Sequence, residues 1–98
     1  MKQVFISQPM MGKTNDEIRK ERQETVEKLE QRGFKVIDSI VAITPEAAFN
    51  EPVYYLSQSI YLLSQCDYAY FMDGWRTARG CLIEHTIAKE YGITIIHE

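Results

Sequence analysis

The sequence predicts an α/β protein with a small parallel sheet and helices on both faces. Short apolar segments alternate with longer amphipathic segments along the whole chain, and this alternation is typical of consecutive βαβ units. Each connection between two expected strands is long enough to hold a helix, so the strands should run parallel with right-handed crossovers. A length of 98 residues leaves room for one domain, residues 1–98. We therefore expect a compact three-layer α/β sandwich of about four strands.

The first expected strand covers residues 3–6, a short apolar run. After it, Thr14 and Glu17 have the spacing of a capping box, which begins a helix. That helix is expected to run to Arg32, because Gly33 supplies the residue type that most often follows a helix end. Its apolar stripe is thin, so its other faces should contact solvent.

The middle of the chain should hold the second strand and the second helix. Residues 34–37 read as a buried strand, and residues 53–65 read as a helix. Between them, residues 38–52 carry turn signals at both prolines and are expected to follow the surface.

The last third of the chain repeats the alternation. Residues 66–72 form the third expected strand, and residues 78–91 form a third helix that Gly92 stops. Residues 93–96 are a fourth apolar strand.

The expected helix over residues 53–65 is apolar on nearly every side. One face carries Val53, Leu56, Ile60 and Leu63, and the remaining faces carry mostly tyrosine and leucine. Because exposed aromatic patches usually mark contacts, we expect a homo-oligomer, a dimer or larger. The alternative is a large tyrosine-rich surface that contacts only water.

Composition narrows the possible partners. A formal net charge of −3 argues against a nucleic-acid polymer as the main partner. No apolar run reaches membrane-spanning length, and Lys2 precedes a short strand instead of a signal peptide's apolar core. Two cysteines, Cys66 and Cys81, have neither a disulfide framework nor metal-ligand spacing. We expect a reduced, cytoplasmic protein.

Cofactor and metal motifs are missing as well. Gly12-Lys13-Thr14 is like the end of a phosphate-binding loop, but the preceding glycine of that motif is lacking, and there is no G-x-G-x-x-G. His85 and His97 lie on different expected elements without a nearby carboxylate pattern. His85 is expected to be a solvated helix residue, and we expect neither cofactor nor metal.

The strongest candidate site follows the third strand, in residues 73–84. Ligands of open α/β sheets bind beyond the carboxyl ends of the strands, and here Asp73, Trp75, Arg79 and Gly80 would occupy that position. Glu84 lies one helical turn after Gly80, and its neighbours three and four residues away are small or apolar. A carboxylate on a core-facing stripe must be paired, protonated or solvated by a cleft. The alternative is a rim glutamate paired with Arg79 or Lys89.

Several of these motifs together resemble one family. The opening Ser7-Gln8-Pro9-Met10-Met11-Gly12 is similar to an S-x-P-M-x-G signature of short proteins related to nucleoside 2-deoxyribosyltransferases. Cys66-Asp67, Gly74-Trp75 and Arg79-Gly80-x-x-x-Glu84-His85 match the same family in the same order. The resemblance spans almost the whole chain.

This resemblance implies a flavodoxin-like fold and an activity on the N-glycosidic bond of a nucleoside or nucleotide. Glu84 matches the glutamate that attacks C1′ of the deoxyribose, four residues after a glycine, to form a glycosyl-enzyme ester. Asp73 or Asp67 would stand in as the acid, with a structural role favoured for Asp67 because it opens the third strand, and Trp75 would stack on the base. The substrate-binding residues implied or expected are Ser7, Gln8, Pro9, Met10, Gly12, Gly74, Trp75, Arg79 and Gly80.

The chain also departs from the family pattern. Ala78 stands two residues before Gly80, where the enzymes carry an aspartate or serine, and residues 59–61 lack the acidic residue expected before the third strand. Three hypotheses remain open. The first is a deoxyribosyltransferase or nucleoside hydrolase. The second is a deoxynucleoside 5′-monophosphate N-glycosidase that binds the phosphate with Lys13, Arg76 or Arg79. The third is a nucleotide-sensing module without catalysis.

Overall fold

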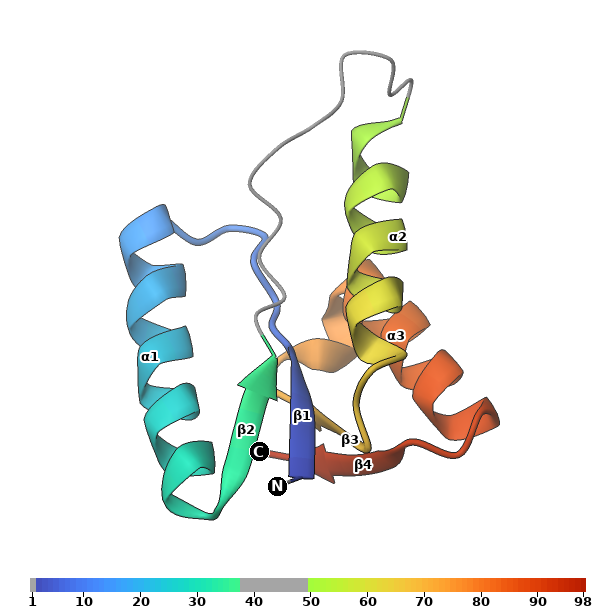
Figure 1. Ribbon diagram of the computed structural model, residues 1–98. Coiled ribbons are helices and arrows are strands. Elements are labelled where there is room, and N and C mark those ends of the chain that lie inside the picture. Colours follow the sequence, from blue (N-terminus) through green and yellow to red (C-terminus); the bar gives the residue numbers. More distant parts are fainter. Residues whose placement is uncertain (1, 38–49) are drawn as a thin grey trace.

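The computed structural model describes residues 2–37 and 50–98, and these residues form one parallel four-stranded sheet (Figure 1). The sheet order is β2-β1-β3-β4, so β1 and β3 are the central strands. Ser7 at the end of β1 pairs with Phe71 of β3, which pairs with His97 of β4. The carboxyl ends of three strands therefore meet at one edge. The strands are β1 Lys2–Ser7, β2 Phe34–Ile37, β3 Tyr68–Phe71 and β4 Thr94–His97.

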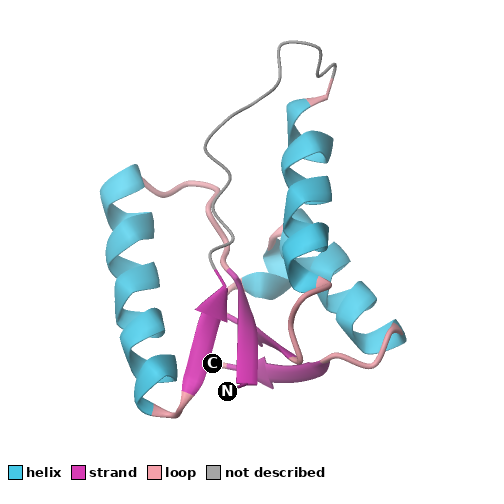
Figure 2. Cartoon of the chain, viewed as in Figure 1, coloured by secondary structure: helices cyan, strands magenta, loops and turns pink. Residues whose placement is uncertain are grey.

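Helices cover both faces of the sheet (Figures 1 and 2). On one face, α1 (Asn15–Gln31) packs through Leu29 against Val4, Ile6, Tyr70 and Met72. On the other face, α2 (Glu51–Leu63) and α3 (Arg79–Glu90) contribute to a core of six buried residues. The expected three-layer α/β sandwich is confirmed, and it is consistent with a flavodoxin-like arrangement. The six residues are Phe5, Leu63, Cys66, Ala69, Phe71 and Ala88.

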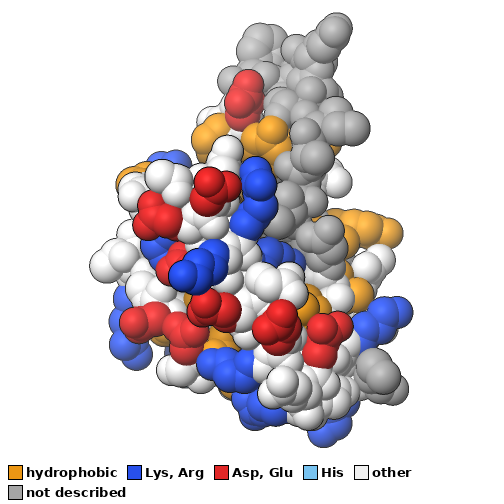
Figure 3. All heavy atoms as spheres, turned by 90° about the vertical axis from the view of Figure 1, so that its left-hand side faces the viewer, with side chains coloured by type: hydrophobic (Ala, Val, Ile, Leu, Met, Phe, Trp, Pro, Cys, Tyr) orange, Lys and Arg blue, Asp and Glu red, His pale blue; other side chains and the backbone are white. Residues whose placement is uncertain are grey.

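The capping box of α1 is present as the sequence predicts. The Thr14 hydroxyl accepts a hydrogen bond from the Glu17 backbone N–H, and the Glu17 carboxylate accepts one from the Thr14 N–H. The helix ends at Gln31, with Arg32 as its cap and Gly33 at φ 87°. Figure 3 shows acidic and basic side chains mixed over this side of the molecule. The outer face of α1 is therefore solvated, as expected.

The second helix begins earlier than residue 53. It starts at Glu51, Asn50 caps it by accepting from the Val53 N–H, and Pro52 lies in its first turn. Proline fits there because a first-turn N–H needs no helical partner. The interpretation of Pro52 as a surface-turn signal was therefore wrong. The remainder of that expectation, residues 38–49, lies outside the described residues.

The connection from β3 to α3 contains a short 3₁₀ helix, η1 (Trp75–Thr77), that the sequence does not predict. Gly74 enters it at φ 90°, a left-handed conformation that glycine adopts without strain. Ala78 caps α3 without a side-chain hydrogen bond. Among the described residues, no helix is both long and apolar enough to cross a membrane.

Candidate active site

Glu84 is a buried carboxylate that faces the sheet from α3. Its side chain is 7% exposed, and the Ser7 Oγ at the end of β1 donates a hydrogen bond of 2.6 Å to Glu84 Oε1. The neighbouring buried positions of α3 are Cys81 and Ala88, so Glu84 does interrupt a core-facing stripe. Within residues 2–37 and 50–98, no ion pair joins Glu84 to Arg79 or Lys89. The rim-glutamate alternative is therefore wrong.

The surroundings of Glu84 favour its protonated form. Burial raises the pKa of this carboxyl to about 7, and the hydrogen bond from Ser7 opposes part of that rise. Both forms of Glu84 are therefore populated near neutral pH. Burial also raises the pKa of the adjacent Cys81 thiol, and the pKa of Cys66 rises to about 11. Both thiols are therefore protonated at neutral pH, so the Cys81 thiol beside Glu84 is a weak nucleophile.

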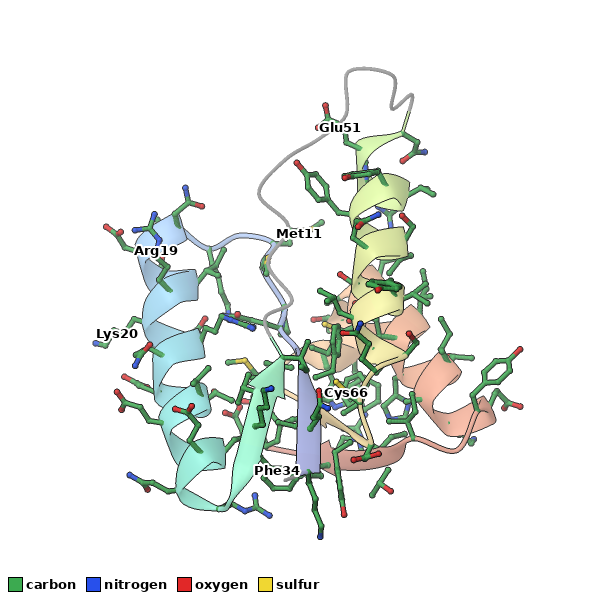
Figure 4. All side chains as sticks on the ribbon, in the orientation of Figure 1. Met11, Arg19, Lys20, Phe34, Glu51 and Cys66 are labelled. Carbon is green, nitrogen blue, oxygen red and sulfur yellow. The ribbon has the colours of Figure 1, made fainter. Side chains whose placement is uncertain are left out.

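Glu84 opens into a cavity of about 470 Å³. Its walls come from the loop after β1, the first turns of α2, and the N-terminal end of α3. Figure 4 shows Met11 in that loop and Glu51 at the start of α2. The residues that line the cavity are Gln8, Pro9, Met10, Met11, Pro52, Tyr55, Leu56, Ser59, Thr77, Ala78, Arg79, Gly80, Cys81 and Glu84.

Most of the expected site residues lie at this cavity. Gln8, Pro9, Met10, Arg79 and Gly80 line it with Glu84, and Ser7 reaches it through its bond to Glu84. A methyl group added at Gly80 would meet no atom within 4 Å. The backbone of α3 therefore leaves room for a ligand at this point.

Gln8 connects the loop after β1 to α1. Its Nε2 donates a hydrogen bond of 2.9 Å to the Ile18 carbonyl, and the side chain is 8% exposed. This bond fixes the loop that forms one wall of the cavity.

Asp73 lies elsewhere, so it is not the acid that assists Glu84. It lines a separate cavity of about 370 Å³ with Lys13, Met72 and Glu98, and its backbone N–H donates to Glu98 Oε2 at 2.7 Å. This second cavity is also lined by Glu21, Thr25 and Lys28 of α1, so Asp73 lies on the α1 side of the sheet edge, whereas the Glu84 cavity is lined by α2 and α3. Gly12 does not line either cavity, and it adopts φ 80° in the loop before α1.

Trp75 is also absent from the Glu84 cavity. Its indole stacks on His85 with centroids 4.1 Å apart and on His97 at 5.3 Å, both at an interplanar angle of 10°. The Arg76 guanidinium lies 5.0 Å from the indole centroid. Gly74 packs beside the loop after β1, because a methyl group there would approach Pro9 Cγ at 3.6 Å. Trp75 and Gly74 thus brace the surrounding structure instead of lining the site.

His85 lies on α3 as expected and remains partly exposed, and its ring also belongs to this aromatic cluster. Its Nε2 lies 3.2 Å from the Nε2 of His97, at the end of β4. Burial is the main cause that lowers the pKa of His85, followed by His97, Lys89 and Arg76. Within the described part of the chain, no group of three or more His, Cys, Asp or Glu residues is arranged for a metal ion.

The comparisons with known proteins assign a family. A family model described as a domain of unknown function (DUF4406) matches residues 2–97. The chain belongs to the DUF4406 family. No curated protein matches its sequence.

A solved structure supports the fold of this DUF4406 domain. A crystal structure of a conserved protein from Enterococcus faecalis V583 superposes with a TM-score of 0.75 at 16% sequence identity. The match covers 99% of this chain and 62% of that protein, so the chain spans about three fifths of the neighbour's length. At this identity, the likeness concerns the fold alone.

The DUF4406 site contains residues that the sequence analysis did not propose. Tyr55, Leu56 and Ser59 present one face of α2 to Glu84, and Met11 and Thr77 complete the wall. The spacing of Tyr55 and Ser59 places them one turn apart. The sequence alone did not show that this face of α2 meets the loop after β1.

Proposed function

We propose that this chain cleaves or transfers the N-glycosidic bond of a deoxynucleoside or deoxynucleotide, with Glu84 as the nucleophile. One observation carries the proposal. Glu84 is a buried carboxylate bonded to the Ser7 hydroxyl, and it faces a cavity beyond the carboxyl ends of the central strands. Its position four residues after Gly80 supports the resemblance to nucleoside 2-deoxyribosyltransferases.

The reaction begins when the ionised Glu84 oxygen attacks C1′ of the deoxyribose. A C1′–O bond to Glu84 forms as the C1′–N bond breaks, and the electron pair of that bond leaves with the base. The negative charge of Glu84 also stabilises the positive charge that develops on the sugar in the transition state. A neutral side chain of the same shape supplies neither effect.

The leaving base must take up a proton. Among residues 2–37 and 50–98, Glu84 is the only acidic side chain that lines the cavity, so we assign this proton to water. Ser59 lines the same cavity, and we assign to its hydroxyl the orientation of that water or of the base. Water or an acceptor base then attacks C1′, and the ester electron pair returns to Glu84. Water gives hydrolysis, and an acceptor base gives transfer.

A second candidate is hydrolysis of a deoxynucleoside 5′-monophosphate. Of the three cations suggested by the sequence, only Arg79 lines the cavity. Lys13 is bonded to Glu21 at 2.9 Å, and Arg76 lies over Trp75. Arg79 is the first residue of α3, which has no side-chain cap, and anions bind favourably at such a helix end.

A third candidate is a nucleotide-sensing module without catalysis. The observation in its favour is that the cavity holds no second acidic side chain among the described residues. This candidate predicts nucleotide binding without base release.

The experiment incubates the protein with deoxynucleosides and their 5′-monophosphates, with and without a free acceptor base, and measures released base by chromatography. Glu84→Gln should abolish release. Glu90→Gln is the matched control, because Glu90 is an exposed residue of the same helix. Full activity in Glu84→Gln would refute the nucleophile. Binding without release from any compound would support the sensing module.

A further inference from the structure

A second hollow adjoins the Glu84 cavity between α2 and α3. Its volume is about 430 Å³. It shares Pro52, Leu56, Arg79 and Gly80 with the Glu84 cavity, so the two hollows are direct neighbours. We call this second hollow the α2–α3 groove. Its lining residues are Asn50, Pro52, Val53, Leu56, Arg79, Gly80 and Ile83.

The α2–α3 groove is apolar, although part of it is open to solvent. Val53 is 58% exposed and Ile83 is 37% exposed. Arg79 is the only charged side chain among its described lining residues. Large apolar side chains that remain exposed in a concave surface usually mark a binding site. The chemistry of the groove therefore fits an uncharged apolar group.

Gly80 stands at the junction of the two spaces. It lines both, and a methyl group added to it would meet no atom within 4 Å. A ligand can therefore extend from Glu84 into the groove across the backbone of α3. This shared wall distinguishes the groove from an isolated apolar patch.

We infer that the α2–α3 groove binds an apolar substituent on the leaving base, so that the preferred substrates are nucleosides or nucleotides with such a substituent. The inference rests on the proposed function, because Glu84 fixes where C1′ must lie. The sugar and the base occupy the Glu84 cavity, and the substituent lies against Val53 and Ile83. Ile83 thus determines specificity without touching the reacting atoms.

The test compares N6-benzoyl-2′-deoxyadenosine with 2′-deoxyadenosine, and N4-benzoyl-2′-deoxycytidine with 2′-deoxycytidine. For each pair, kcat/KM is measured in the wild type, in Ile83→Ser, and in Leu82→Ser. Leu82 is the matched control because it is a neighbouring apolar residue, 42% exposed, that does not line the groove. Comparing ratios between variants removes the effect of the benzoyl group on leaving-group chemistry.

We expect Ile83→Ser to lower the ratio of benzoylated to parent kcat/KM about tenfold, because the substituent loses apolar contact. Leu82→Ser should leave the ratio unchanged. An unchanged ratio in Ile83→Ser would overturn the inference while leaving the proposed function intact. Light scattering measures the molar mass of the protein in solution. If Ile83→Ser lowered that mass while the ratio of benzoylated to parent kcat/KM stayed the same, the groove would be a contact between two copies, and the inference would also fail.

A binding measurement separates this inference from the catalytic proposal. If no compound releases base, the proposed function fails, and calorimetry with the same four compounds still tests the groove. The inference predicts tighter binding of the benzoylated compounds to the wild type and loss of that advantage in Ile83→Ser. Equal binding of the benzoylated and parent compounds would overturn it.

Discussion

Removal of the Ser7 hydroxyl should shift the titration of Glu84 toward higher pH. In the native protein, the Ser7 Oγ donates to Glu84 Oε1 at 2.6 Å, and this bond lowers a pKa that burial raises to about 7. Ser7→Ala removes a bond that stabilises the ionised form. The variant therefore holds the Glu84 proton more tightly than the wild type does.

The magnitude follows from the type of bond. A hydrogen bond to a charged group contributes about 1.5–3 kcal/mol, and this corresponds to about one to two pH units. The midpoint for Glu84 in Ser7→Ala is therefore expected between about 8 and 9, starting from about 7 in the native protein. Because attack on C1′ needs the ionised form, which is about half of Glu84 at pH 7 in the wild type, kcat/KM at pH 7 should fall about 5- to 50-fold and recover as the pH rises.

Two measurements check this shift. Carbon-13 NMR of labelled glutamate side chains follows the carboxyl directly, without need of a substrate, and the pH profile of kcat/KM follows its effect on base release. Ser59→Ala is the matched control, because Ser59 lines the same cavity but is not the donor to Glu84 Oε1. The reasoning is refuted if Glu84 titrates at the same pH in Ser7→Ala and in the wild type.

Three further predictions concern the same helix. Gly80→Ala should raise the free energy of unfolding, but by less than the roughly 1 kcal/mol typical of a helix interior, because Gly80 is the second residue of α3. It should lower base release, because the methyl group enters open space at a residue that lines the cavity. Urea denaturation and the base-release assay measure the two effects, and unchanged release would contradict the placement of the substrate. Glu84→Gln should remove a pH dependence of stability. The pKa of Glu84 in the folded protein is about 7 against a usual 4.5, so the free energy of unfolding of the wild type should fall by about 3 kcal/mol as the pH rises from about 4.5 through 7. A Glu84→Gln protein that kept this pH dependence in urea denaturation would refute the assignment. His85→Gln should have the opposite pH dependence. The pKa of His85 is lowered from 6.5 in the folded protein, so the contribution of neutral His85 to the free energy of unfolding is present above about pH 6.5 and is lost on acidification. The variant should therefore lose less stability than the wild type between pH 7 and 5, and an equal loss in urea denaturation would contradict this.

Local patterns were sufficient to predict much of the fold. The capping box joins Thr14 and Glu17, which are three residues apart, and Gly33 lies just after the end of α1. Both ends of this helix could therefore be predicted from neighbouring residues. The neighbours of Glu84 at helical spacing on α3 suggested a core-facing carboxylate, and the structure decides for it over the rim alternative. Pro52 was misread because a proline marks a turn and a first helical turn equally well.

Contacts between distant elements could not be predicted in the same way. The stack of Trp75 on His85 and His97 joins η1, α3 and β4, and no local spacing specifies it. Asp73 and Trp75 were placed at the site because they follow β3, but Asp73 lies in a cavity lined by α1, and the Trp75 ring stacks on His85. Tyr55 and Ser59 line the cavity only because α2 lies next to the N-terminal end of α3. No local pattern in the sequence predicts this arrangement.

The central claim is that Glu84 attacks C1′. Its most direct test is mass spectrometry of the protein after rapid acid quenching during turnover of a deoxynucleoside, followed by peptide mapping. The account predicts a deoxyribosyl ester on Glu84, absent from Glu84→Gln. Base release without a sugar adduct on Glu84, or with full retention in Glu84→Gln, would contradict it.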